Sequence, residues 1–185
     1  LRHGERIFLE PPAELVVNRR TEDFYIVNCE GSLSMMEILD RFGRVPLPPY
    51  INRPANRNDV NRYQTVFAKQ QGAVAAPTAG LHISKDFLEG CKQKSVEIGY
   101  LTLHIGSGTY EPIRNLEVNE HHMHQEHMDL SRDLCDRINR VKINGGRVFA
   151  VGTTVLRALE TVARSRGAIK PFRGETGLFI RPGFS

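Results

Sequence analysis

Imidazole and carboxylate side chains gather between residues 121 and 127, where the chain reads His-His-Met-His-Gln-Glu-His. Imidazole titrates near neutral pH, and imidazole with carboxylate suits zinc, iron or nickel. The run matches neither the His-Glu-x-x-His pattern nor a zinc-finger spacing. We therefore rank an acid–base or binding role above a metal site and expect no bound metal, with a solvated loop as the alternative. In an extended segment, His122, His124 and Glu126 would lie on one face.

The stretch from Gly72 to His82 combines a small apolar run with a titratable side chain. It reads Gly-Ala-Val-Ala-Ala-Pro-Thr-Ala-Gly-Leu-His, and its first half predicts a buried strand that Pro77 ends. Thr78 and Gly80 belong to a turn of small residues, which lets backbone approach a ligand closely. A strand followed by such a turn is where α/β proteins place ligands. The alternative is a structural turn with a core histidine.

A glycine and two threonines open a predicted helix at Gly152-Thr153-Thr154. Free backbone N–H groups and the positive end of the helix dipole attract a carboxylate or phosphate at such a position. Arg157 follows one turn later and is placed to add a bidentate guanidinium to the same anion. The alternatives are a plain threonine N-cap and a solvated surface arginine.

Arginines and tyrosines alternate around residues 50–63, where Arg53, Arg57 and Arg62 interleave with Tyr50 and Tyr63. Guanidinium groups bind phosphates and aromatic rings stack on bases, so the mixture is typical of nucleic-acid contacts. A charged loop between domains has the same composition and is the alternative.

Residues 1–50 predict a small β-rich domain. Three short β-rich runs, Arg6–Glu10, Glu14–Arg19 and Phe24–Cys29, indicate an antiparallel sheet. Ser34 and Glu37 have capping-box spacing, so a helix is expected from Met35 to Phe42. The prolines that follow place a domain boundary within residues 46–61.

Residues 51–185 predict an α/β domain in which strands and helices alternate, as an open sheet or a distorted barrel. Helices are expected after the capping residues Ser84 and Ser131 and from Gly152 to about Arg166. The expected strands are the apolar runs at residues 72–76, 100–105, 147–151 and 177–181. Loops that contain glycine follow the first three strands, at 77–82, 106–110 and 152–154. Parallel strands end on one face of a sheet, so we expect these loops to converge.

The bulk properties are those of a folded protein of 185 residues, with 40% hydrophobic and 25% charged residues. A net charge of +4 permits a polyanionic partner such as RNA. The three cysteines form no Cys-x-x-Cys pair, which favours a reducing compartment, and we expect a cytoplasmic monomer. No apolar run predicts a membrane span or a signal peptide. The chain starts at Leu1, so we expect a piece of a longer protein.

Several segments taken together indicate one protein family far more specifically than any single segment does. In chain order they are Pro46–Ile51, Tyr63–Ala68, Gly72–His82, Leu103–Tyr110, Met123–Glu126, Val151–Thr154 with Arg157 and Glu160, and Phe179–Gly183. From Gly43 to Phe184 the chain closely resembles the S-adenosylmethionine:tRNA ribosyltransferase-isomerase family (QueA) of queuosine biosynthesis. Residues 1–42 match loosely, Ile83 stands where the family has phenylalanine, and the family's C-terminal Thr-Asn-Phe-His region is missing.

The resemblance implies a transferase that acts on tRNA. The ribosyl part of S-adenosylmethionine moves to the aminomethyl group of 7-aminomethyl-7-deazaguanine at the wobble position and is isomerised. The products are epoxyqueuosine-tRNA, adenine and methionine. S-adenosylmethionine is a co-substrate, and no metal or redox cofactor is implied. The resemblance also implies an α/β domain with a smaller β-barrel-like domain inserted.

The resemblance also selects the site residues, to which we assign roles. The catalytic candidates are His82 and, as its partner, Glu126 or His124, because each lies outside a helix interior. The substrate-binding candidates are Thr78, Gly80, Gly106, Gly108, Thr109, Thr153, Thr154 and Arg157. The RNA-binding candidates are Arg53, Arg62, Tyr63 and Gln64. These assignments require His82, Thr153 and Glu126 to lie around one cleft.

Two other classes of function stay open at this point. A tRNA-binding piece without catalysis would keep the RNA contacts and bind with a steep salt dependence. A metal-dependent hydrolase would use the histidines of His121–His127.

Overall fold

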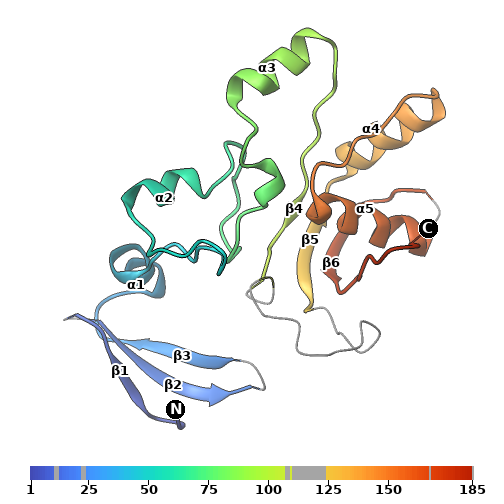
Figure 1. The fold of residues 1–185 in the computed structure, drawn as a ribbon. Helices are drawn as coiled ribbons and strands as arrows, with labels where there is room; N and C mark the ends of the chain where they lie inside the picture. The colour runs from blue at the N-terminus through green and yellow to red at the C-terminus, as the bar shows by residue number, and fades with distance from the viewer. Residues whose placement is uncertain (11–12, 22–23, 107–108, 110–123, 167, 185) are drawn as a thin grey trace. The chain divides into compact units, whose positions relative to one another are not determined.

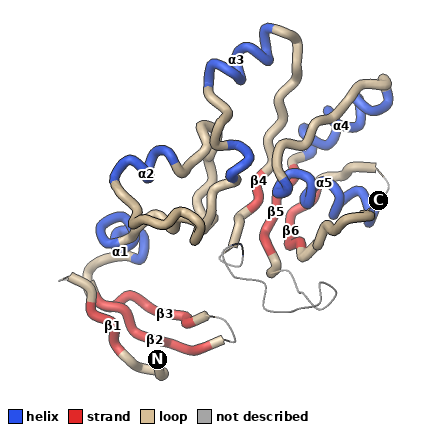
Figure 2. The backbone as a smooth tube through the Cα atoms, viewed as in Figure 1, coloured by secondary structure: helices blue, strands red, loops and turns tan. Residues whose placement is uncertain are grey.

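The computed structural model describes residues 1–10, 13–21, 24–106, 109, 124–166 and 168–184, which Figures 1 and 2 draw in colour. The chain divides into two compact units, Leu1–Val45 and Pro46–Ser185. Gly108 and the His121–Met123 part of the histidine run lie outside the described residues.

The first unit contains an antiparallel sheet and one helix. Its strands are β1 (Arg6–Phe8), β2 (Glu14–Arg20) and β3 (Tyr25–Glu30), paired in the order β1-β2-β3. The small antiparallel sheet predicted for this region is confirmed, with strand bounds that differ by one or two residues. Figure 2 shows the three strands side by side.

Helix α1 (Met35–Phe42) has the predicted bounds. Ser34 caps it: the Glu37 N–H donates to Ser34 Oγ at 3.3 Å, and the Ser34 N–H donates to Glu37 Oε2 at 2.8 Å. Ile38 of the helix is buried in a cluster with Ala13 and Leu33, so this unit has its own small apolar core.

The second unit contains another antiparallel sheet. Its strands are β4 (Thr102–Leu103), β5 (Glu126–Leu130) and β6 (Phe172–Thr176), in the order β4-β5-β6. Along β5, Glu126, Met128 and Leu130 are buried, as the two-residue period of a strand requires. The first of these inward positions therefore carries a carboxylate where the other two carry apolar side chains.

The core of this unit forms between the sheet and two helices. The helices are α4 (Arg132–Ile143), capped by Ser131, and α5 (Thr153–Arg166). The fully buried side chains belong to one cluster that draws on β5, α4 and α5: Met128, Leu130, Cys135, Ala158 and Val162. Burial raises the pKa of the Cys135 thiol, so Cys135 serves packing.

Three shorter elements complete the second unit. They are α2 (Arg57–Arg62), the single turn η1 (Thr78–Gly80) and α3 (Lys85–Gln93). Ser84 caps α3 as predicted, because its hydroxyl accepts the Phe87 N–H at 3.0 Å. None of the helices in the described part of the chain is both long and apolar enough to cross a membrane.

The mixed α/β class is confirmed, but the predicted strand arrangement is wrong. Both described sheets are antiparallel, and neither closes into a barrel within the described residues. The runs at 72–76, 147–151 and 177–181 are not strands. The region 100–105 is reduced to the two residues of β4.

The reason is that strand formation depends on a partner as well as on apolar composition. Gly72 has φ +133°, outside the β region. Within residues 72–76, the Val74 N–H donates to the Ile105 carbonyl at 2.8 Å, but no strand forms there. The real ladder joins β5 to β6, in which polar residues alternate with buried ones. Because β6 contains the charged residues Arg173 and Glu175, a search for apolar runs does not find this strand.

Helix α2 was missed because its sequence is polar. Asn56 Oδ1 accepts the Asn58 N–H at 2.9 Å, and Asp59 Oδ2 accepts the Asn56 N–H at 2.7 Å. Asp59 also receives both arms of the Arg53 guanidinium, each at 2.7 Å, although its side chain is only 8% exposed. The spacing Asn56-x-x-Asp59 is a capping box that could have been recognised.

Acid is expected to loosen the start of α2. The Arg53 hydrogen bonds, and then the Asn56 N–H, hold the pKa of the Asp59 carboxyl well below its usual range. A lowered folded pKa means that the stabilisation is complete above the unfolded pKa of about 4 and is lost as pH falls through the folded value. The Asn56 amide resonance should therefore shift at acid pH in NMR spectra. In the Asp59→Asn variant, the Asn56 amide resonance should not shift at acid pH. An identical titration of this resonance in both proteins would contradict the prediction.

Candidate active site

A cavity of about 320 Å³ opens in the second unit, within the size range of ligand pockets. Its walls come from loops and element ends that are far apart in sequence. The lining residues are Pro48, Pro49, Tyr50, Tyr63, Ala75, Ala76, Pro77, Thr78, Ala79, Ile105, Thr109, Glu126, Gly152, Thr153, Thr154 and Arg157. Residues of all three predicted glycine-containing loops thus lie around one cavity, although the runs before two of them, 72–76 and 147–151, are not strands.

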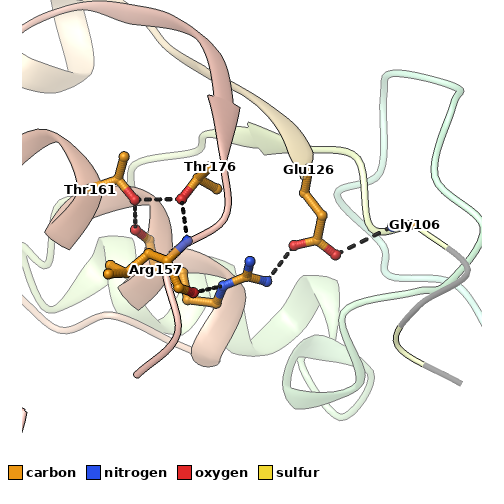
Figure 3. A network of polar contacts seen from close by, with 6 residues as sticks. Gly106, Glu126, Arg157, Thr161 and Thr176 are labelled. Carbon is orange, nitrogen blue, oxygen red and sulfur yellow. Dashed lines mark hydrogen bonds and ion pairs between the residues drawn. The ribbon is translucent and has the colours of Figure 1, made fainter. Parts of the chain in front are cut away.

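A buried ion pair forms part of the cavity wall. Arg157 Nη1 donates to Glu126 Oε2, and the two side chains are 11% and 7% exposed. The other carboxylate oxygen of Glu126, Oε1, accepts the Gly106 N–H at 3.3 Å. Figure 3 shows the carboxylate between these two donors. Each charge is compensated by the other, so the two residues form one structural unit.

Further hydrogen bonds fix the arginine in place. Arg157 Nε donates to the Leu178 carbonyl at 2.9 Å, and the Thr161 hydroxyl donates to the Arg157 carbonyl at 2.7 Å. The Thr161 and Thr176 hydroxyls lie 2.6 Å apart, and Thr176 Oγ1 accepts the Leu178 N–H at 3.2 Å. These contacts form a closed ring that joins α5 to the last residue of β6, Thr176, and to Leu178 beyond it. The third guanidinium nitrogen, Nη2, is buried without a hydrogen-bond partner among the described residues.

The N-terminus of α5 also lies on the cavity. Gly152, Thr153 and Thr154 line it, and the Gly152 carbonyl accepts the Leu156 N–H at 3.2 Å. Gly152 has φ +91°, and a Cβ there would lie 3.1 Å from the Ala79 Cβ, so both backbone conformation and space favour glycine. A glycine has no side chain with which to cap the first N–H groups, which leaves them for a ligand.

Several predicted site residues are not among those that line the cavity. His82 is exposed in the connection between η1 and α3, and His124 is half-buried just before β5. Gly80 is buried, and a Cβ there would lie 2.8 Å from Phe67 Cζ, so packing explains this glycine. Gly106 contributes its N–H to Glu126.

The predicted RNA-binding residues differ in their position relative to the cavity. Tyr63 lines the cavity, whereas Arg53, Arg62 and Gln64 are not among its lining residues. Arg53 is bound to Asp59 but its side chain remains 47% exposed. Arg62 and Gln64 are exposed, and Gln64 Oε1 accepts the Thr65 N–H at 2.8 Å.

The candidate site residues chosen from the sequence do not include Pro48, Pro49 or Tyr50, although all three line the cavity and Tyr50 belongs to the arginine–tyrosine mixture. A Pro-Pro-Tyr tripeptide is rigid and carries a large ring, which is the signal that could have found them. Within the described residues, no group of three or more His, Cys, Asp or Glu side chains is placed to hold a metal ion.

A mixed α/β chain whose cavity combines a helix N-terminus, hydroxyl groups and a buried ion pair has the features of a ligand-binding α/β protein. The chain belongs to the family described as queuosine biosynthesis protein, whose family model matches residues 1–185. This confirms the resemblance that the sequence segments indicated.

Named relatives agree with this family. The chain is 47% identical over 180 residues to an S-adenosylmethionine:tRNA ribosyltransferase-isomerase of Francisella philomiragia, which covers 97% of the chain and 53% of the relative. It is 44% identical over 181 residues to the protein of that name from Coxiella burnetii, covering 98% and 52%. The chain therefore spans about half the length of the curated relatives it matches.

Proposed function

We propose that the full-length protein containing this chain is an S-adenosylmethionine:tRNA ribosyltransferase-isomerase. It would transfer and isomerise the ribosyl moiety of S-adenosylmethionine onto 7-aminomethyl-7-deazaguanine at the tRNA wobble position, giving epoxyqueuosine-tRNA and releasing adenine and methionine. The relatives' shared name supports this proposal. In the proposed enzyme, residues 1–50 belong to a smaller β-rich domain and residues 51–185 belong to the catalytic domain. The protein acts as a cytoplasmic monomer without a metal.

The observation that carries the proposal is the composition of the cavity. Thr78 from η1, Glu126 from β5 and Thr153 from α5 all line it, and the resemblance had selected each of them separately. S-adenosylmethionine carries a carboxylate, and the uncapped N–H groups of α5 suit that group. We assign Thr153, Thr154 and Arg157, which line the cavity together, to the methionine carboxylate.

The reaction also needs proton transfers. A base must remove a proton from the carbon next to the sulfonium, and an acid must protonate the departing adenine. Glu126 lies on the cavity wall and is our candidate for contact with the reacting atoms. His82 and His124 are the candidate partners, although neither is among the residues that line the cavity, so this role requires them to reach the substrate from outside that lining. Thr78, Gly80, Gly106, Gly108 and Thr109 are assigned to the substrate, and Arg53, Arg62, Tyr63 and Gln64 to the tRNA.

The decisive assay incubates the full-length protein with S-adenosylmethionine and tRNA that carries the precursor base. Chromatography should detect free adenine and methionine in equal amounts, and only when the tRNA is present. Consumption of S-adenosylmethionine without tRNA, or no consumption at all, would contradict the proposed reaction.

Removal of the His82 imidazole is expected to slow this reaction. A general acid or base contributes about 10²-fold or more to turnover, so His82→Ala should lower kcat by about that factor. His3→Ala, an exposed histidine of the first unit, is the matched control and should keep the wild-type kcat. If His82→Ala and Glu126→Ala both retain full turnover, the catalytic assignment is wrong.

A further inference from the structure

One part of the cavity wall is built from rings. Pro48, Pro49, Tyr50 and Tyr63, which we call the ring wall, line the same cavity as Thr153 and Arg157. Tyr50 is 78% exposed although it borders a cavity. A single exposed tyrosine is ordinary, but one grouped with a second tyrosine and two prolines around a cavity is a feature of ligand sites.

Backbone hydrogen bonds hold Tyr50 in a turn. The Ile51 N–H donates to the Pro48 carbonyl at 2.9 Å, which closes a four-residue turn with Pro49 in its second position. Proline fixes φ near the value that this position needs. The Arg53 N–H then donates to the Ile51 carbonyl at 2.8 Å. The Tyr50 ring is therefore presented by a rigid backbone.

Asp59 connects the two tyrosine-bearing segments. Its carboxylate binds the Arg53 guanidinium through both oxygens at 2.7 Å, and its carbonyl accepts the Tyr63 N–H at 2.8 Å. Arg53 follows the Tyr50 turn, and Tyr63 ends α2. The salt bridge and the helix end thus belong to one scaffold that holds both tyrosines at the cavity.

Flat rings on a rigid support suit a flat ligand. Aromatic side chains stack on nucleobases through their faces and need no specific hydrogen bond for this. The same cavity offers charged and N–H donors on α5, which suit an anionic group. A ligand that combines a base with an anion would use both kinds of wall.

We propose that the ring wall is a subsite that stacks a purine-type base. The inference rests on the proposed function, because both substrates in that reaction carry such a base: the adenine of S-adenosylmethionine and the deazaguanine of the tRNA. Tyr50 is the principal stacking residue, and Tyr63 borders the same subsite.

The test compares Tyr50→Ala and Tyr50→Phe in the full-length protein, with Tyr25→Ala in the first unit as the matched control. Loss of a stacked ring weakens binding by about 10-fold or more, whereas phenylalanine keeps the ring and should stay within about twofold of wild type. Calorimetry gives the Kd of S-adenosylmethionine, and initial rates give the KM for tRNA. A change in the Kd assigns the subsite to adenine, and a change in the KM alone assigns it to the tRNA base.

The outcomes separate this inference from the proposed function. If wild type binds and consumes S-adenosylmethionine but Tyr50→Ala changes neither Kd nor KM, the subsite is wrong and the proposed function stands. If wild type does not bind S-adenosylmethionine, adenosine alone becomes the probe. Adenosine binding that Tyr50→Ala weakens supports the subsite, and absence of adenosine binding overturns it.

Discussion

Arg157→Ala is expected to lower the free energy of unfolding by about 3–5 kcal/mol, the range measured when one partner of a buried ion pair is removed. The Glu126 side chain is 7% exposed and would lose its main hydrogen-bonding partner while it stays buried. The substitution also removes the Nε bond to the Leu178 carbonyl. Urea unfolding of the full-length protein, followed through the transition of the second unit, measures the change in midpoint.

Two further variants define the origin of this loss. Arg173→Ala removes an exposed pair, Arg173 with Asp129 at 3.8 Å, and should cost less than about 1 kcal/mol. The double variant Arg157→Met with Glu126→Gln removes both buried charges and should recover part of the lost stability. If Arg157→Ala unfolds at the same midpoint as Arg173→Ala, the pair does not stabilise the unit.

Local features of this chain could be predicted from sequence because their causes lie within a few residues. Ser34, Ser84 and Ser131 each accept an N–H three residues later, and a helix starts after each as expected. The glycine and threonines at 152–154 likewise precede α5. Such contacts depend on spacing alone, which the sequence displays.

Non-local pairing could not be predicted in the same way. Glu126 and Arg157 were selected for separate roles, as a catalytic partner and as an anion binder, yet they bind each other across 31 residues. No local pattern specifies this contact, since it depends on how α5 packs against β5. Residues 147–151 make the same point: their apolar composition suits a strand, but no described strand pairs with them.

The ion pair changes how the site is interpreted. With Nη1 bound to Glu126 and Nε to Leu178, Nη2 is the guanidinium nitrogen left without a hydrogen-bond partner among the described residues, and it is buried. The guanidinium cannot present the bidentate fork that the sequence suggested without breaking one of these contacts. The α5 N–H groups are therefore the main anion donors in our proposal, and Arg157 mainly orients Glu126.

Glu126→Gln is expected to lower kcat of the full-length protein by about 10²-fold or more, the effect of removing a general acid or base. Both oxygens of the carboxylate accept from donors, Gly106 N–H on one side and Arg157 on the other. An amide has one acceptor and one donor, so its NH₂ group must face one of these donors. The substitution removes the charge and disturbs the orientation at once.

Glu126→Asp separates these two effects, because it keeps the charge but shortens the side chain. If orientation by Arg157 matters, Glu126→Asp and Arg157→Lys should both lower kcat while the KM for S-adenosylmethionine changes little. Glu175→Gln, on the exposed face of β6, is the matched control and should keep the wild-type kcat. All rates are compared at a temperature where circular dichroism shows each variant folded. A Glu126→Gln protein with wild-type kcat would exclude Glu126 from the reaction and leave it a structural role, since a carboxylate that touches the reacting atoms cannot be neutralised without effect.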